Sequence, residues 1–366
     1  RIDTAPPTGY GFLSPTPEAL GYDRIVTSGT WATLTDAGAG VDPEPYRFRY
    51  SSFSTMVDAS TSVWVSTGTV WGPPTYTLSP NTTYWFQVQA RDRVGNISSW
   101  STAQSKVSLC NDNFTASWQA VYITSVTVAW IDPTPNNPAN TKYIVQVSSD
   151  NFTSITASSV TVRSASPATI TGLGANTTYY ARILAENWET VRSTVNVAGG
   201  TPRATLCYAP SGVTWHSTDI FITSMTVIWT NPDSNPANTK YIAQISSMVP
   251  FSAFSSSETV RSAGQAIITG LSANTTYWAR VIAQNWENVG STSTVTSAKP
   301  TKCYPPSSPG WQTVNITSVT VNWTTPGGNP ENTIYKVDIS SASDFAWITK
   351  SSTTINSLGN ATLTGL

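Results

Sequence analysis

The feature that most constrains the fold is a repeat that can be read directly from the letters. A strand-like segment ends in tryptophan three times, as ITSVTVAW, ITSMTVIW and ITSVTVNW, at Trp130, Trp229 and Trp323. A turn and a second strand follow each time, as NPANTKYIVQVSS, NPANTKYIAQISS and NPENTIYKVDISS, with Tyr143, Tyr241 and Tyr335. Self-similarity at a fixed period indicates that each repeat is one structural unit. The chain is therefore predicted to be a tandem array of similar domains.

Three cysteines set the period, because Cys110, Cys207 and Cys303 occur once per repeat in the same local setting, 97 and 96 residues apart. A chain of 366 residues holds three or four domains of that size. We predict three complete repeats and a fourth with strands A to E only, at residues 1–108, 109–205, 206–301 and 302–366. The first repeat is the most divergent. The sequence begins with Arg and stops inside a repeat, so we expect the full gene product to be longer.

Alternation of apolar and polar residues predicts β-structure. From Tyr179 onward, every second residue is aliphatic or aromatic, which is the period of a strand buried on one face: Tyr179, Ala181, Ile183 and Ala185. Ser, Thr, Asn, Val and aromatic residues crowd the sequence, which favours strands and turns over helices. The predicted fold class is all-β, with sandwiches in an elongated array.

These residues resemble fibronectin type III modules. Such modules carry a core Trp, then a core Tyr, then a Leu before a turn that leads to a buried Tyr, the tyrosine corner. The second and third repeats fill these places in order, with Trp130, Tyr143, Leu173 and Tyr179, and with Trp229, Tyr241, Leu271 and Tyr277. In the first repeat, Trp31, Tyr46, Leu78 and Tyr84 take the same positions. The resemblance implies tandem immunoglobulin-like β-sandwiches.

The three cysteines lie too far apart for pairing within an extended array, since a disulfide needs Cα atoms within about 7 Å. Two interpretations remain: Cys110, Cys207 and Cys303 are small apolar residues packed at domain junctions, or they are cross-links between chains. The fourth repeat, which stops at Leu366, also has two interpretations. Either the fragment simply ends there, or strands from a neighbouring molecule complete the sandwich.

Little in the sequence points to catalysis or a cofactor, so we predict no enzyme, no cofactor and no metal. The single histidine, His216, cannot make a metal cluster. Asp36, Asp42 and Glu44 lack the dense acidic spacing of a calcium loop and fit a turn equally well. Only 11% of residues are charged and the net charge is −1, which argues against nucleic acid as a partner and against an anionic membrane surface. No apolar stretch is long enough to cross a bilayer.

Nine N-x-S/T sequons are present, at Asn81, Asn96, Asn113, Asn151, Asn176, Asn274, Asn315, Asn322 and Asn360. Three of them, Asn81, Asn176 and Asn274, occupy the same NTTY turn, where the turn itself accounts for the asparagine.

Apolar residues on the predicted outer sheet face suggest an interface. Their recurrence would give a stripe for packing against other copies of the chain, formed by Ile144, Tyr180 and Leu184 and by Ile242, Trp278 and Ile282. Alternatively, long side chains or an adjacent loop cover this stripe within each domain. Trp188 and Trp286 fall in the loop between strands F and G, where an aromatic ring could contact glycans or pin the loop.

Together these features favour an extracellular or cell-surface structural protein that forms or decorates a filament, sheath or stalk by self-association. The alternative is a spacer or carbohydrate-binding region of a larger secreted polysaccharide-degrading enzyme or adhesin.

Overall fold

The computed structural model describes residues 3–9, 12–14, 30–31, 34–66, 78–260, 263–355 and 359–366. The chain divides into two compact units, the first comprising Arg1–Leu173 and Thr178–Arg203, the second Gly174–Thr177 and Ala204–Leu366. Each unit contains two separate hydrophobic cores. These four cores fall inside the four predicted repeat ranges, although the boundaries themselves stay a prediction.

The first unit begins with the divergent repeat. Its strands are β1 (Phe12–Ser14), β2 (Thr30–Trp31), β3 (Val41–Ser51), β4 (Ser60–Thr61), β5 (Thr83–Asp92) and β6 (Gln104–Val107). The main sheet has the order β4-β3-β5-β6, and β1 pairs with β2. Along β3, Tyr46, Phe48 and Tyr50 enter the core. The side chain of Trp31, predicted for this core, lies outside the described residues.

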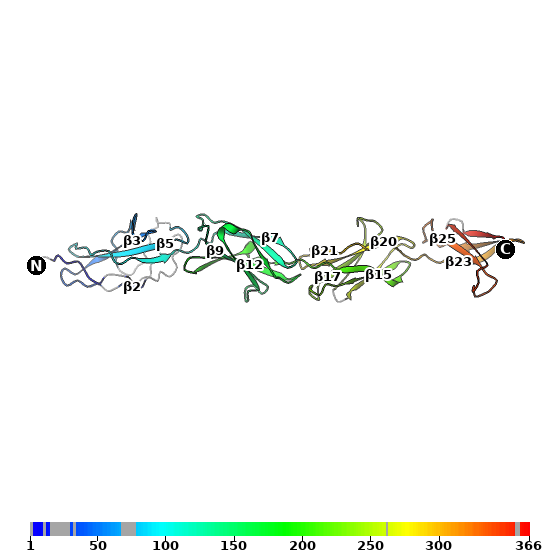
Figure 1. The fold of residues 1–366 in the computed structure, drawn as a ribbon, viewed down its shortest axis with the longest axis horizontal. Coiled ribbons are helices and arrows are strands. Elements are labelled where there is room, and N and C mark those ends of the chain that lie inside the picture. The colour runs from blue at the N-terminus through cyan, green and yellow to red at the C-terminus, as the bar shows by residue number, and fades with distance from the viewer. Residues whose placement is uncertain are drawn as a thin grey trace. The chain divides into compact units, whose positions relative to one another are not determined.

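The second repeat, also in the first unit, is a two-layer sandwich (Figure 1). Its strands are β7 (Thr115–Val121), β8 (Ser125–Ile131), β9 (Lys142–Ser148), β10 (Ala157–Val162), β11 (Ala168–Thr171), β12 (Thr178–Glu186) and β13 (Arg192–Asn196). One sheet has the order β11-β8-β7 and the other β10-β9-β12-β13. Short 3-10 turns occupy Arg163–Ala165 and Val197–Gly200, and β14 is Arg203–Ala204.

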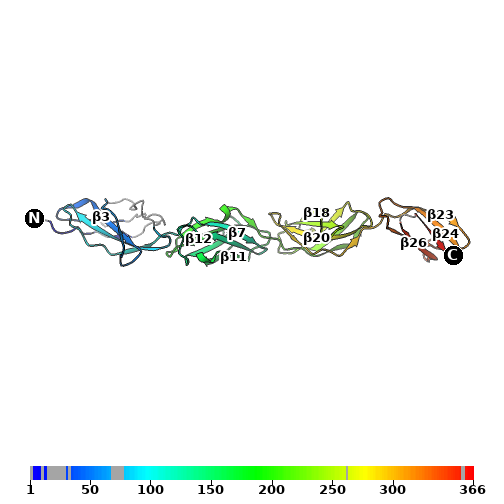
Figure 2. The same cartoon turned by 90° about the horizontal axis from the view of Figure 1, so that it is seen from above.

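The third repeat, in the second unit, has the same two layers (Figure 2). Its strands are β15 (Ser211–Ile220), β16 (Ser224–Thr230), β17 (Lys240–Ser246), β18 (Ser255–Val260), β19 (Gln265–Thr269), β20 (Thr276–Gln284), β21 (Gly290–Thr292) and β22 (Lys299–Pro300). Its sheets run β15-β16-β19 and β18-β17-β20-β21.

The fourth repeat forms a sheet of order β23-β24-β27 and the pair β25-β26. Its strands are β23 (Ser307–Val314), β24 (Ser318–Thr324), β25 (Ile334–Ile339), β26 (Lys350–Ile355) and β27 (Asn360–Thr364).

The strand order of the second and third repeats is that of fibronectin type III sandwiches, which confirms the predicted all-β fold class. The cores of the second, third and fourth repeats hold the predicted tryptophan against the predicted tyrosine, with ring centroids 5.5 Å apart for Trp130 and Tyr143. The corner is also formed, because the hydroxyl of Tyr84 accepts the N–H of Ser79 and the hydroxyl of Tyr277 accepts that of Ser272. In the described part of the chain, no helix is long and apolar enough to span a membrane.

Candidate functional site

The loops that follow β12 and β20 share one conformation, which is built on an asparagine. Asn187 Oδ1 accepts the backbone N–H groups of Glu189 and Val191, and Asn285 makes the same two bonds in its own loop. This pattern lets a short polar side chain satisfy the backbone of a tight turn. Each loop thereby presents the N–H of its tryptophan outward.

In the first unit, the backbone N–H of this tryptophan forms a hydrogen bond with the preceding repeat. Trp188 donates its backbone N–H to Asn81 Oδ1 at 2.9 Å, and Asn81 Nδ2 donates to Thr141 Oγ1 at 2.9 Å. Asn81 is 1% exposed and has a φ of +46°, which asparagine tolerates better than most residues. We call the set Asn81, Thr141 and Trp188 the joint latch, because one amide group bonds two segments of the following repeat.

The second unit contains a second latch with matching geometry. Trp286 donates its N–H to Asn176 Oδ1 at 2.9 Å, and Asn176 Nδ2 donates to Thr239 Oγ1 at 3.0 Å. Asn176 is likewise 1% exposed, with a φ of +44°. Because both bonds recur, the latch is a regular feature of the repeat.

A carboxylate and an amide reinforce each latch. Glu189 accepts the N–H of Val107 at 3.1 Å and forms an ion pair with Lys106 at 2.7 Å, while Asn187 Nδ2 donates to the carbonyl of Ser108. In the second unit, Glu287 accepts the N–H of Ala204 at 2.7 Å and Asn285 Nδ2 donates to the same residue's carbonyl. The loop therefore holds the segment that enters its own repeat.

A third asparagine, which sequence reasoning missed, fixes the start of the second, third and fourth repeats. Asn137 Oδ1 accepts the N–H of Asn111, and Asn137 Nδ2 donates to the carbonyl of Asn111 and to the hydroxyl of Tyr143. Asn235 and Asn329 make the same three bonds in the third and fourth repeats. The recurrence of an Asn six residues before the core tyrosines Tyr143, Tyr241 and Tyr335 was the signal that could have identified them.

The NTTY sequons differ in accessibility. Asn81 and Asn176 are buried and use both amide atoms in the latches, whereas Asn274 is half-buried and donates to Thr333 Oγ1 at 3.0 Å. Five other sequon asparagines are exposed: Asn113, Asn151, Asn315, Asn322 and Asn360.

The predicted cross-link residues fall into two groups. Cys110 and Cys207 are unpaired and buried, at 2% and 0% exposed, and burial raises the pKa of each thiol to about 12. Both properties disfavour the thiolate that reacts, so these two residues match the packing interpretation. Cys303 is also unpaired but exposed.

The predicted outward stripe needs a correction in the second repeat. Ile144 and Leu184 are each only 6% exposed, so they are not an open apolar surface. They are cross-strand neighbours, and the adjoining row is occupied by Glu186 with its ion-pair partners Lys142 and Arg192. These long side chains flank the apolar pair, as the alternative interpretation expected. Elsewhere Tyr180, Ile242, Trp278 and Ile282 are half-buried.

The loop tryptophans Trp188 and Trp286 remain open to solvent, at 45% and 44% exposed. Their backbones are fixed by the latches while their rings are available. The structure therefore permits a ring contact with a further molecule and leaves glycan binding a prediction.

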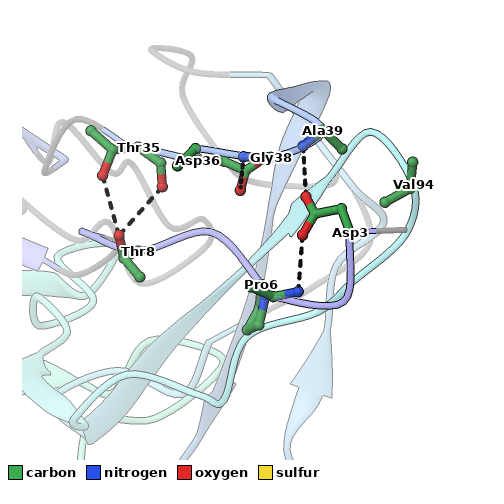
Figure 3. A pocket seen from close by; sticks show the side chains of 10 residues that line it. Asp3, Pro6, Thr8, Thr35, Asp36, Gly38, Ala39 and Val94 are labelled. Atoms are coloured by element: carbon green, nitrogen blue, oxygen red, sulfur yellow. Dashed lines mark hydrogen bonds between the residues drawn. The ribbon is translucent and has the colours of Figure 1, made fainter. Parts of the chain in front are cut away.

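Three carboxylates that are distant in sequence meet at one end of the first repeat. Asp3, Asp36 and Asp92 each have an oxygen within 4.8 Å of the others, beside a cavity of about 810 Å³. Figure 3 shows Asp3 directed toward Ala39, whose N–H it accepts at 2.6 Å. Asp36 accepts the N–H groups of Gly38 and Gly40.

Asp92 is the fully buried member of this cluster. Burial alone would raise its pKa, but hydrogen bonds from Asn96, Val94 and Gly95 together hold the pKa below its ordinary value. Asp92 Oδ1 accepts the N–H groups of Val94 and Asn96, as Asn187 does in its loop. Asp36 and Asp92 therefore act as turn-forming groups, because each accepts backbone N–H groups of its own loop.

The other acidic and basic candidates lie apart from this cluster. Asp42 forms an ion pair with Arg91 and accepts the N–H of Glu44. His216 lies on β15, half-exposed, 3.2 Å from Asp219.

No family model matches the sequence, and no curated protein matches it either. Similar solved structures include a two fibronectin type III domain segment of chicken tenascin, with 18% identity, a TM-score of 0.37 and coverage of 52% of this chain and 100% of that chain. They also include the FN1–FN3 domains of chicken CNTN1, with 14% identity, a TM-score of 0.26 and coverage of 82% and 99%. The strand order, rather than these scores, establishes the fold.

Proposed function

We propose that this protein is a non-catalytic structural repeat protein of the cell exterior, whose repeats are coupled by latches and which builds a filament, sheath or stalk with copies of itself. The observation that carries the proposal is the latch seen twice, at Asn81 and at Asn176. Repeats that only display independent binding sites have no need for buried hydrogen bonds across their joints. An element that carries force or sets a spacing needs such bonds, because free joints would let it bend.

Self-association is supported by the half-buried apolar residues of the third repeat. Ile242 and Ile282 are cross-strand partners, and Trp278 lies on the same face of β20. None of these three side chains is buried, whereas Ile144 and Leu184 of the second repeat are. Apolar surface of this kind is typical of interaction sites.

The test is sedimentation velocity over a concentration series, combined with electron microscopy of the same samples. We expect concentration-dependent assembly that the double variant Trp278→Ser/Ile282→Ser weakens. Ile267→Ser is the matched control, because Ile267 is 59% exposed on β19 in the other sheet. A wild-type protein that stays monomeric at every concentration contradicts the self-association part of the proposal.

The second candidate function is a spacer or glycan-binding region of a larger secreted enzyme or adhesin. It is favoured by the open rings of Trp188 and Trp286 on fixed loops. Loss of glycan binding in Trp188→Ala and Trp286→Ala, with the latch bonds intact because they use backbone N–H groups, would favour this function.

A further inference from the structure

The outer face of the first repeat carries a ladder of alternating arginine and tryptophan side chains. The Cζ atom of Arg49 lies 4.3 Å from the ring centroid of Trp100, and that of Arg47 lies 5.4 Å from the same ring. Arg47 also lies 4.9 Å from the ring of Trp64, which Arg91 approaches at 4.6 Å. The order along the ladder is therefore Arg49, Trp100, Arg47, Trp64 and Arg91. All contacts are within the distance at which a cation is attracted to an aromatic ring.

The strands hold this ladder in place. Arg47 and Arg49 alternate with the core residues of β3, so they project from the sheet face opposite the core. Arg47 bonds Gln89 at 2.6 Å and Arg49 bonds Gln87 at 2.8 Å, each across to β5. Because both glutamines are anchored in turn to backbone carbonyls of Ser98 and Ser101, the guanidinium groups are pre-positioned. We call Arg47, Arg49, Arg91, Trp64 and Trp100 the arginine ladder.

The arginine ladder has more positive charge than its neighbours neutralise. Arg91 pairs with Asp42 at 3.2 Å. Arg47 and Arg49 have glutamine oxygens as partners and contact no carboxylate in the described part of the chain. Adjacent like charges repel, and a guanidinium offers five donors, of which these two residues use only some. A bound anion would relieve the repulsion and accept terminal N–H groups that the glutamines leave unused, whereas Arg47 Nε is buried.

The same sheet face has different chemistry in the other repeats. The pair Arg47 and Gln89 occupies the place that Ile144 and Leu184 hold in the second repeat, as judged from the core tyrosines that precede them. There Arg182 lies over Phe152 and bonds Gln146, and Arg192 pairs with Glu186. Among the described residues, such a ladder occurs in the first repeat alone, so the sandwich does not require it.

We propose that the arginine ladder is a binding surface for an anionic polysaccharide, an assignment independent of the structural role proposed above. Charge complementarity requires an anion. Linear peptides are usually bound along a sheet edge or in a groove, whereas these arginines lie on a sheet face, between β3 and β5. A flat row of cations bordered by half-buried indole rings suits a chain of sugar rings with acidic groups.

The test uses the whole chain and three probes: heparin, which carries sulfate and carboxylate groups, polygalacturonate, which carries carboxylates only, and neutral dextran. Titration calorimetry at low salt is expected to show binding to one or both acidic polymers and none to dextran. Arg47→Gln/Arg49→Gln should weaken this binding at least tenfold. Arg182→Gln/Arg280→Gln, the matched pair in the other repeats, should change it less than twofold. Binding should also weaken as salt is raised.

A second measurement uses the wild-type protein, so its result does not depend on whether the variant folds. Phenylglyoxal modification read by mass spectrometry should be suppressed at Arg47 and Arg49, but not at Arg182 and Arg280, when the acidic polymer is added. The proposal is overturned if neither acidic polymer binds, if both arginine pairs are equally affected, or if polyglutamate binds more tightly than either polysaccharide. The last result would assign the surface to an acidic peptide.

Discussion

Trp188 donates its backbone N–H to Asn81 across 2.9 Å, although the two residues are 107 positions apart in the sequence. The bond couples the loop after β12 to the turn before β5, so it joins two sandwiches that have separate cores. Its acceptor is a side chain and its donor is backbone. The strength of the joint can therefore be altered at Asn81 without touching the loop.

Removing the Asn81 side chain should weaken the first unit. Asn81→Gly keeps the φ of +46° accessible and loses both latch bonds. The loss of hydrogen bonds at a buried position should cost about 1–3 kcal/mol of unfolding free energy. Asn81→Asp is a comparison variant that keeps the acceptor for Trp188 but places a carboxylate at a buried position. Chemical denaturation measures both, and equal stability of Asn81→Gly and wild type would contradict the latch.

Glu186 should make the second repeat sensitive to acid. Hydrogen bonding to Lys142 is the main reason that its pKa lies below the ordinary value of 4.5, and Arg192 adds to the effect. A lowered pKa means that the folded state favours the carboxylate, so this stabilisation is present above the ordinary pKa and disappears as the pH falls through the folded one.

Glu186→Gln should therefore destabilise the protein by about 0.5–1 kcal/mol at neutral pH, because Lys142 and Arg192 are about half exposed and solvent screens the ion pairs. Below the folded-state pKa of Glu186, the difference from wild type should shrink. Thermal unfolding as a function of pH measures this, and a difference that stays constant from pH 7 to acid would be inconsistent with the ion pairs seen here.

The three thiols should react very differently in the native protein. Cys303 is exposed, whereas burial raises the pKa of Cys110 and Cys207 to about 12. Iodoacetamide at pH 8 should label Cys303 and leave the other two unlabelled until denaturant is added. Peptide mass spectrometry reads the result, and rapid native labelling of Cys207 would refute its burial.

Expression in a glycosylating host should discriminate among the sequons. Asn81 and Asn176 commit both amide atoms to the latches, so a glycan there would prevent joint formation. We expect folded protein to carry glycans only at other sites, such as the exposed Asn113 and Asn151. Folded, latched protein with full occupancy at Asn81 would rule this out.

Much of the fold could be predicted because its signals are local or repeated. The core pairing of Trp130 with Tyr143 follows from strand alternation and from recurrence of the same letters. The latches could not be predicted, because Asn81 and Trp188 carry no pattern that links them. Local turn chemistry is enough to explain an asparagine at position 81. Only the folded structure shows which groups form hydrogen bonds with its side-chain amide.

The outer sheet face shows a second limit. Alternation correctly places Ile144 and Leu184 away from the core, but it does not reveal that Lys142, Glu186 and Arg192 form ion pairs in the adjoining row. Long side chains bury apolar neighbours through conformations that a sequence pattern does not encode. The meeting of Asp3 with Asp92 likewise brings together residues distant in the sequence, which no local pattern predicts.

The most direct test of the coupled-repeat account is the distribution of distances between the first and second repeats. Spin labels at Val63 and Val160, which are 78% and 61% exposed, allow pulsed electron paramagnetic resonance in a Cys303→Ser background. The account predicts a narrow distribution for this background and a broad one when Asn81→Gly is added. Distributions of equal width in the two proteins would contradict it.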